Sequence, residues 1–114
     1  AIVSPSASIG VGYVLCAGVR VNARATIGRG AILNTACTFD HDCKLQDGVH
    51  VSPGANLAGN VSVDHRSWVG IGSAVREGIS IGKDCIVGAG SAVIEDVADG
   101  STVVGVPARE KSRK

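Results

Sequence analysis

The sequence predicts an all-β chain whose short parallel strands wind into a single β-helix of about five triangular coils. A bulky apolar residue stands at every sixth position from Val3 to Val93 without an exception, and most of these residues follow a small residue two positions earlier. The composition agrees, because it is 45% hydrophobic but only 3% aromatic, with 16 glycines, as narrow stacked layers require. A period of six excludes an amphipathic helix, which repeats every 3.6 residues. The apolar positions are Val3, Ile9, Leu15, Val21, Ile27, Leu33, Phe39, Leu45, Val51, Leu57, Val63, Val69, Val75, Ile81, Val87 and Val93.

Each six-residue unit is predicted to be a short strand followed by a sharp turn. Residues two apart on a strand point to the same face, so the small and the bulky residue both point inward. The position directly after the bulky residue is rich in Gly, Asn and Asp, and the position three after it is rich in Gly. We expect left-handed backbone at both positions. Three such sides close one triangular coil, which stacks on the next by parallel pairing.

The repeat ends after Val93. Residues 1–98 are predicted to form the β-helix, and residues 99–114 a capping segment with a basic tail. The run 96–100 is rich in turn residues, and 101–108 reads as one extended segment. A stacked fold needs such a cap over its last layer. The Lys/Arg-rich end is interpreted as a solvated tail.

Composition also narrows the function. A net charge of +1 gives no field that would gather nucleic acid or an anionic membrane surface. No apolar run approaches the roughly 20 residues that span a bilayer, and no signal-peptide pattern opens the chain, so a cytoplasmic protein is expected. Three of the four cysteines, Cys37, Cys43 and Cys85, occupy small inward positions, which favours reduced and packed thiols. Neither disulfides nor a metal is predicted.

The outward residues suggest where chemistry takes place. A convex prism has no pocket, and small-molecule sites are concave, so an active site requires a groove between prisms and therefore an oligomer. Asn34, His41 and His50 are outward or corner residues, and Gly59 follows His41 by 18 positions and so stacks on it. We expect these four residues to converge on one region of the surface. Trp68 also points outward, and we expect it in a subunit interface.

Several runs resemble one subfamily of hexapeptide-repeat acyltransferases, the sialic acid O-acetyltransferases and the bacterial UDP-amino-sugar N-acetyltransferases. The resemblance extends over essentially the whole chain. It implies a left-handed coil, a homotrimer with sites between subunits, and transfer of an acetyl group from acetyl-CoA to an amine or hydroxyl of a sugar or nucleotide sugar. The runs are AILNTACTFDHDC (31–43), VHVSPGA (49–55), RSWVGIG (66–72) and VVGVPA (103–108).

The resemblance also implies roles for single residues. His41 is expected to be the general base, which an imidazole suits at neutral pH. Asp42 is expected to orient the His41 ring, with Asp40 as a rival for that role. The N–H of Gly59 is expected to face the oxyanion. Asn34 is expected to hold the acceptor, and His50 to contact the carbonyl region of acetyl-CoA. The remaining cofactor contacts are expected at Ile71, Gly72, Ala89, Gly90, Gly105 and Pro107.

Alternatives remain at this point. Members of the subfamily usually carry a nucleotide-sugar-binding α/β domain ahead of the β-helix, and we expect this chain to lack it because the repeat starts almost at Ala1. A catalytically inactive structural trimer or fragment is therefore one alternative. A γ-type carbonic anhydrase is another, since it shares the fold and needs three metal-binding histidines. His41, His50 and His65 do not match that family's spacing, and His65 is interpreted as a surface residue.

Overall fold

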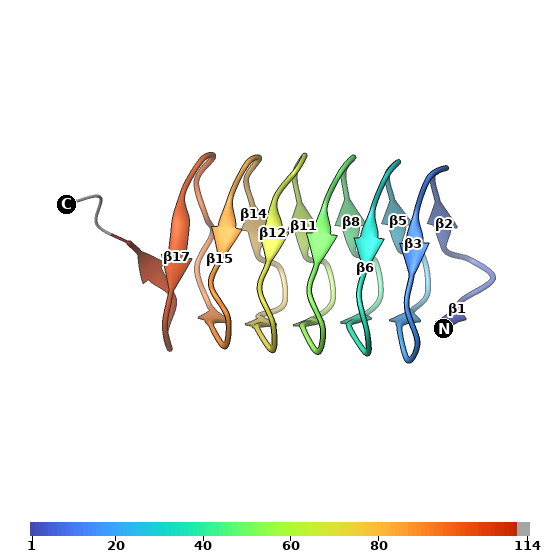
Figure 1. Cartoon of the computed structure of the whole chain (residues 1–114), viewed down its shortest axis with the longest axis horizontal. Coiled ribbons are helices and arrows are strands. Elements are labelled where there is room, and N and C mark those ends of the chain that lie inside the picture. The colour runs from blue at the N-terminus through green and yellow to red at the C-terminus, as the bar shows by residue number, and fades with distance from the viewer. Residues whose placement is uncertain (112–114) are drawn as a thin grey trace.

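The chain folds into a parallel β-helix of about six turns, and the computed structural model describes its residues 1–111 (Figure 1). Three sheets, named A, B and C here, form the sides of the prism. Sheet A contains β1 (Ile2–Val3), β4 (Arg20–Val21), β7 (Thr38–Phe39), β10 (Asn56–Leu57), β13 (Ala74–Val75) and β16 (Ala92–Val93). Sheet B contains β2 (Ser8–Ile9), β5 (Thr26–Ile27), β8 (Lys44–Leu45), β11 (Ser62–Val63) and β14 (Ser80–Ile81). Sheet C contains β3 (Val14–Leu15), β6 (Ile32–Leu33), β9 (His50–Val51), β12 (Trp68–Val69), β15 (Ile86–Val87), β17 (Thr102–Val104) and β18 (Arg109–Glu110).

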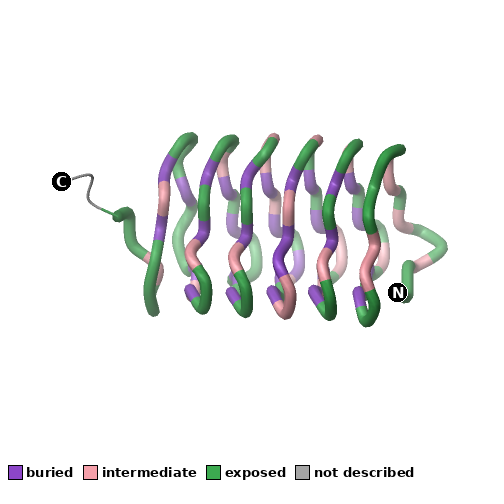
Figure 2. The backbone as a smooth tube through the Cα atoms, viewed as in Figure 1, coloured by how far each residue is buried: buried purple, intermediate pink, exposed green. Residues whose placement is uncertain are grey.

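The chain passes from sheet A to B to C and back to A, so each coil has an A/B, a B/C and a C/A corner. Each strand from β1 to β13 pairs in parallel with the strand one coil later, in a register of 18 residues such as Phe39 with Leu57. From β4 to β16 the second residue of each strand points inward and is buried, and buried residues recur in each coil after the first (Figure 2). Leu33 and Phe39 are fully buried. The prediction of an all-β, left-handed parallel β-helix is thereby confirmed.

The turns correct one part of the prediction. Left-handed backbone occurs three positions after the bulky residue, but the position directly after it does not have positive φ. Asn34 and Asp40 occupy the position directly after the bulky residue because their side chains accept the next backbone N–H, both at 2.8 Å. Glycine occurs at this same position because a side chain would strike the next coil: a Cβ at Gly70 would lie 2.5 Å from the Val87 carbonyl oxygen. The non-glycine residues with positive φ are Arg24, Ala36, Asp42, Asn60, Arg66 and Asp84.

The β-helix changes at its last turn. The pairing of β17 with β15 has an offset of 16 residues, Ile86 with Thr102, so this coil is two residues short. The shortened turn is held by the Asp96 carboxylate, which accepts the Ser80 N–H at 2.8 Å. Strand β17 is still parallel and β18 adds to it antiparallel, so the coil continues into the segment predicted to be a cap. The end of the predicted basic tail, 112–114, lies outside the described residues.

The cysteines are free and packed as predicted. Cys37, Cys43 and Cys85 are buried, and burial raises the pKa of the Cys37 thiol to about 12. A thiol with so high a pKa is inert as a nucleophile. Within residues 1–111 there is no helix long and apolar enough to cross a membrane.

Candidate active site at the A/B corner

His41 and Asp42 form a hydrogen-bonded pair on the turn between β7 and β8. The Nδ1 of His41 lies 3.0 Å from Oδ2 of Asp42. A carboxylate can only accept, so the neutral ring carries its proton on Nδ1 and leaves the Nε2 lone pair free. Both side chains are partly exposed, at 44% and 33%. The arrangement is that of a base whose tautomer is set by an acid.

The two aspartates beside His41 have different partners. Asp40 accepts the backbone N–H of His41 through Oδ1 at 2.8 Å, whereas Asp42 contacts the ring. Asp42 reaches the ring from a left-handed backbone with φ of 60°, a conformation that is uncommon outside glycine and is enriched in Asn and Asp. Of the two candidates left open by the sequence, Asp42 is the one in contact with the imidazole.

Arg24 is part of this cluster and was missed by the sequence analysis. Its Nε donates to Oδ1 of Asp42 at 2.9 Å and its Nη2 donates to Oδ2 at 2.9 Å. These bonds from Arg24, with the bond from His41, lower the pKa of the Asp42 carboxyl to about 2. Arg24 precedes Asp42 by 18 residues, so the coil register was a usable signal for this pair.

Gly59 lies one coil beyond His41, and the Asn60 N–H donates to the His41 carbonyl at 3.0 Å. A Cβ at Gly59 would lie 2.5 Å from Nε2 of His41 and 2.8 Å from its Cε1. The ring therefore covers Gly59, which is buried, and only glycine leaves room for it. The Gly59 N–H has no acceptor within residues 1–111, whereas the N–H at the same turn position in Arg29 donates to Asp47.

The other predicted site residues lie elsewhere on this chain. His50 is on the outer side of sheet C, and Asn34 follows β6 at the C/A corner. The expectation that Asn34, His41, His50 and Gly59 converge within one chain is therefore wrong for Asn34 and His50. Two outward residues lie at the same corner only when their spacing along the chain is a whole number of coils. This holds for His41 and Gly59, but Asn34 and His50 are not a whole number of coils from His41. Apart from His50, the predicted cofactor residues lie on turns that follow strands of sheet C, on the C/A side: Ile71, Gly72, Ala89, Gly90, Gly105 and Pro107.

The outer side of sheet C carries an apolar stripe, defined by Val14, Ile32, Trp68 and Ile86 around His50. Val14, Trp68 and Ile86 are 50%, 53% and 52% exposed, and register places all five residues in one row across the strands. The rings of His50 and Trp68 lie 4.3 Å apart. Both ring nitrogens of His50 are buried and have no hydrogen-bond partner within residues 1–111. An exposed apolar row of this kind is typical of an interaction surface.

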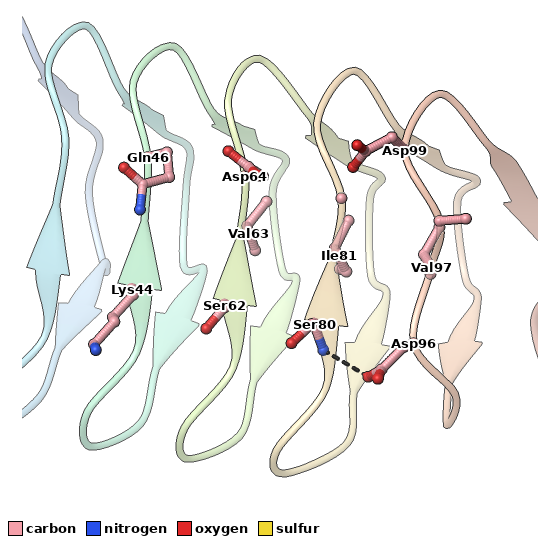
Figure 3. Close-up of a pocket in the computed structure, with 12 residues that line it drawn as sticks. Lys44, Gln46, Ser62, Val63, Asp64, Ser80, Ile81, Asp96, Val97 and Asp99 are labelled. Atoms are coloured by element: carbon pink, nitrogen blue, oxygen red, sulfur yellow. Dashed lines mark hydrogen bonds between the residues drawn. The ribbon is translucent and has the colours of Figure 1, made fainter.

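A groove of 520 Å³ lies on sheet B, away from these residues (Figure 3). Lys44, Ser62, Ser80 and Asp96 form one row along it, and Gln46, Asp64 and Asp99 form the other. The surface is hollowed here because the outward side chains of β11 and β14 are serines. The sequence-predicted site residues do not line it.

The histidines give no support for a metal centre. His41 is at the A/B corner, His50 is on sheet C, and His65 is at the B/C corner after β11. The Nδ1 of His65 lies 2.6 Å from Oδ1 of Asp64, so it forms a separate pair. In the described part of the chain no three His, Cys, Asp or Glu side chains are grouped to bind a metal ion.

Comparisons with known proteins give the family context. The chain is 34% identical over 110 residues to a GDP-perosamine N-acetyltransferase of Escherichia coli O157:H7, covering 92% of this chain and 50% of that protein. PerB from Caulobacter crescentus, solved with CoA and GDP-perosamine, is 46% identical with a TM-score of 0.96, covering 97% of this chain and 54% of that one. The acetyltransferase domain of PglB from Neisseria gonorrhoeae, solved with acetyl coenzyme A, is 43% identical with a TM-score of 0.94, covering 96% and 54%.

The matches cover the β-helix but not the whole of each relative. The chain spans about half the length of the relatives that it matches, and no protein-family model matches it. Identities of 43% and 46% together with TM-scores of 0.94 and 0.96 show homology rather than a shared fold alone. The chain is therefore a homologue of these acetyltransferases over its β-helix, which corresponds to about half of each.

Proposed function

We propose that the chain transfers an acetyl group from acetyl-CoA to the amine of a nucleotide-linked amino sugar. The observation that carries this proposal is the geometry of His41, whose Nδ1 is held by Asp42 while its Nε2 lies over Gly59. The relatives support the substrate class, since one is named a GDP-perosamine N-acetyltransferase and PerB was solved with CoA and GDP-perosamine. Transfer to a sugar hydroxyl uses the same base and is the neighbouring possibility.

His41 acts as the general base in this proposal. The amine nitrogen attacks the thioester carbonyl carbon, and Nε2 takes a proton from that nitrogen. The carbon–sulfur bond then breaks, and the proton passes from the imidazolium to the leaving thiolate. Asp42 keeps the proton of the neutral ring on Nδ1 and stabilises the imidazolium. A positioned base of this kind contributes about 10²–10⁴-fold in rate.

Three other residues complete the chemistry. The Gly59 N–H, which has no acceptor within residues 1–111, donates to the oxyanion that forms on the thioester carbonyl. His50 contacts the carbonyl region of acetyl-CoA, which gives a partner to ring nitrogens that have none in the described chain. Asn34 contacts the acceptor. The last two roles require a second subunit, because neither residue lies at the A/B corner.

The assembly in this proposal is a homotrimer with sites between subunits. One subunit contributes the A/B corner with His41, Asp42 and Gly59, and its neighbour contributes sheet C and the C/A corner. The apolar stripe on sheet C supplies the contact, because burying Trp68 and Ile86 removes apolar surface from water. The geometry supports this division, since a complete residue set exists only when two chains combine.

The C/A corner fits an extended cofactor arm. Gly72 and Gly90 are exposed, and a Cβ at either position would meet nothing within 4 Å. Ala89 is also small and exposed, so the backbone of successive turns is open to contact. The pantetheine arm lies along Ile71, Gly72, Ala89 and Gly90, with the nucleotide end near Gly105 and Pro107. A cytoplasmic location agrees with the use of acetyl-CoA and with reduced cysteines.

The test is thiol release from acetyl-CoA with a panel of nucleotide amino sugars and sialic acids. We expect release with at least one acceptor, and a loss of about 10²-fold or more in His41→Ala. His65→Ala is the matched control, because His65 occupies the same turn position and also pairs with an aspartate; it should keep full activity. Equal activity in wild type and His41→Ala would remove His41 from the mechanism. Absence of both release and acetyl-CoA binding would favour the inactive structural trimer.

A further inference from the structure

Arg24 and Asp42 form a fork-like ion pair across two coils of the A/B corner. Nε and Nη2 of the guanidinium each donate to a separate carboxylate oxygen, both at 2.9 Å. Bidentate pairing fixes the plane of the carboxylate as well as its position. Both residues have left-handed backbone, with φ of 58° and 60°, which aims their side chains along the same corner.

One carboxylate oxygen joins the pair to the histidine. Oδ2 of Asp42 accepts from Nη2 of Arg24 and also lies 3.0 Å from Nδ1 of His41. Asp42 alone is a short side chain that is one-third exposed and free to rotate in water. With Arg24 in place, the fork holds Oδ2 toward the ring. Arg24 thus acts on the orientation of the imidazole without touching it.

The same chain provides an internal comparison at the B/C corner. Arg66 and Asp84 form an equivalent fork, with Nε–Oδ1 and Nη2–Oδ2 distances of 2.8 and 3.0 Å. Their carboxylate does not contact a histidine, because Nδ1 of His65 pairs with Asp64 instead. The fork by itself is therefore a feature of the corners, and its connection to a histidine is specific to Arg24.

We infer that Arg24 is a positioning residue for the His41 base, acting through Asp42 on the tautomer and the orientation of the ring. The effect of Arg24 on catalysis rests on the proposed function. The effect of Arg24 on the His41 ring can be measured without an activity assay. An exposed ion pair contributes little to stability, so loss of Arg24 should change the histidine more than the fold.

The test is ¹⁵N NMR of the labelled histidine rings in the intact chain. Wild type should show the neutral His41 ring protonated on Nδ1. Arg24→Gln should weaken that signature, because Asp42 loses the fork that holds Oδ2 toward the ring. Arg24→Lys should lose part of the tautomer preference, because it retains the charge but not the fork. Arg66→Gln should leave the tautomer unchanged.

Kinetics supply the second readout. If the acetyl transfer is as proposed, Arg24→Gln should lower kcat about three- to tenfold and leave the KM for acetyl-CoA unchanged, with Arg24→Lys intermediate and Arg66→Gln at wild-type level. An unchanged His41 tautomer in Arg24→Gln would overturn the inference. Changed His41 signals in a protein without acetyltransferase activity would retain the positioning contact and reject the proposed function instead.

Discussion

The His41 ring lies directly against Gly59, the residue one coil later at the same corner. A Cβ at Gly59 would lie 2.5 Å from Nε2 of His41, far inside van der Waals contact. Gly59 does not have positive φ, so its glycine is explained by this contact and not by the backbone conformation. The position of Nε2 relative to the Gly59 backbone is thus fixed by the stacking of one coil on the next.

We expect Gly59→Ala to displace the His41 ring and to lower kcat by about 10²-fold, because small misplacements of a base are costly. The measurement is thiol release together with a thermal melt. A double-mutant cycle provides the control: in the His41→Ala background, Gly59→Ala should cost no further stability, since the ring it strikes is gone. An equal stability loss in both backgrounds would show that the ring is not what excludes a side chain at Gly59.

Asp42 and Asp40 should respond differently to the same substitution. In Asp42→Asn the amide can donate to Nδ1 of His41 and favour the wrong tautomer, so kcat should fall about 10²-fold or more. Asn tolerates the left-handed backbone at this position, which leaves the turn intact. Asp40→Asn keeps an oxygen for the His41 N–H and should retain activity within about threefold. Comparable losses in the two variants would contradict the assignment of Asp42 as the orienting acid.

Much of this molecule could be predicted because its period of six decides which side chains point inward. The strand positions, the buried residues such as Phe39, and the outward direction of His41 all followed from that period. The stacking of Gly59 on His41 followed from the predicted coil, but the grouping with His50 was wrong, because His50 is not a whole number of coils away and lies on a different side. The same register places Arg24 one coil before Asp42, but it does not encode the side-chain rotation that joins the two residues.

Acid should destabilise the wild-type chain partly through Asp42. Its folded pKa is about 2 against an ordinary value of 3.8, chiefly because Arg24 and then His41 bond to the charged form. A depressed folded pKa gives stability that is present above pH 3.8 and is lost as the pH falls toward 2. Thermal melts at pH 5, 4, 3 and 2 should therefore show a smaller acid-induced drop in Tm for Asp42→Asn than for wild type. Parallel curves for the two proteins would rule out this contribution.

The apolar stripe on sheet C should control assembly. Trp68 is 53% exposed and stacks beside His50, so burying it between subunits removes a large apolar surface from water. We expect Trp68→Glu to convert a trimer into single chains, as measured by light scattering after size exclusion. Ser62→Glu is the control, because Ser62 is the outward residue of β11 on sheet B, in the same coil. Dissociation by Ser62→Glu alone would move the interface to sheet B.

Two inactive variants should restore each other if each site is shared between subunits. His41→Ala damages the A/B corner and leaves the C/A corner intact, whereas Ala89→Trp, at an exposed position, blocks the C/A corner and leaves His41 intact. Recovery requires mixed trimers, so the two variants are co-expressed with different tags and isolated by both. In each such trimer, about a third of the sites combine one intact corner from each chain. Thiol release should then recover to about a third of the wild-type rate, while either variant alone stays inactive. Mixed trimers without activity would contradict the proposed site between subunits.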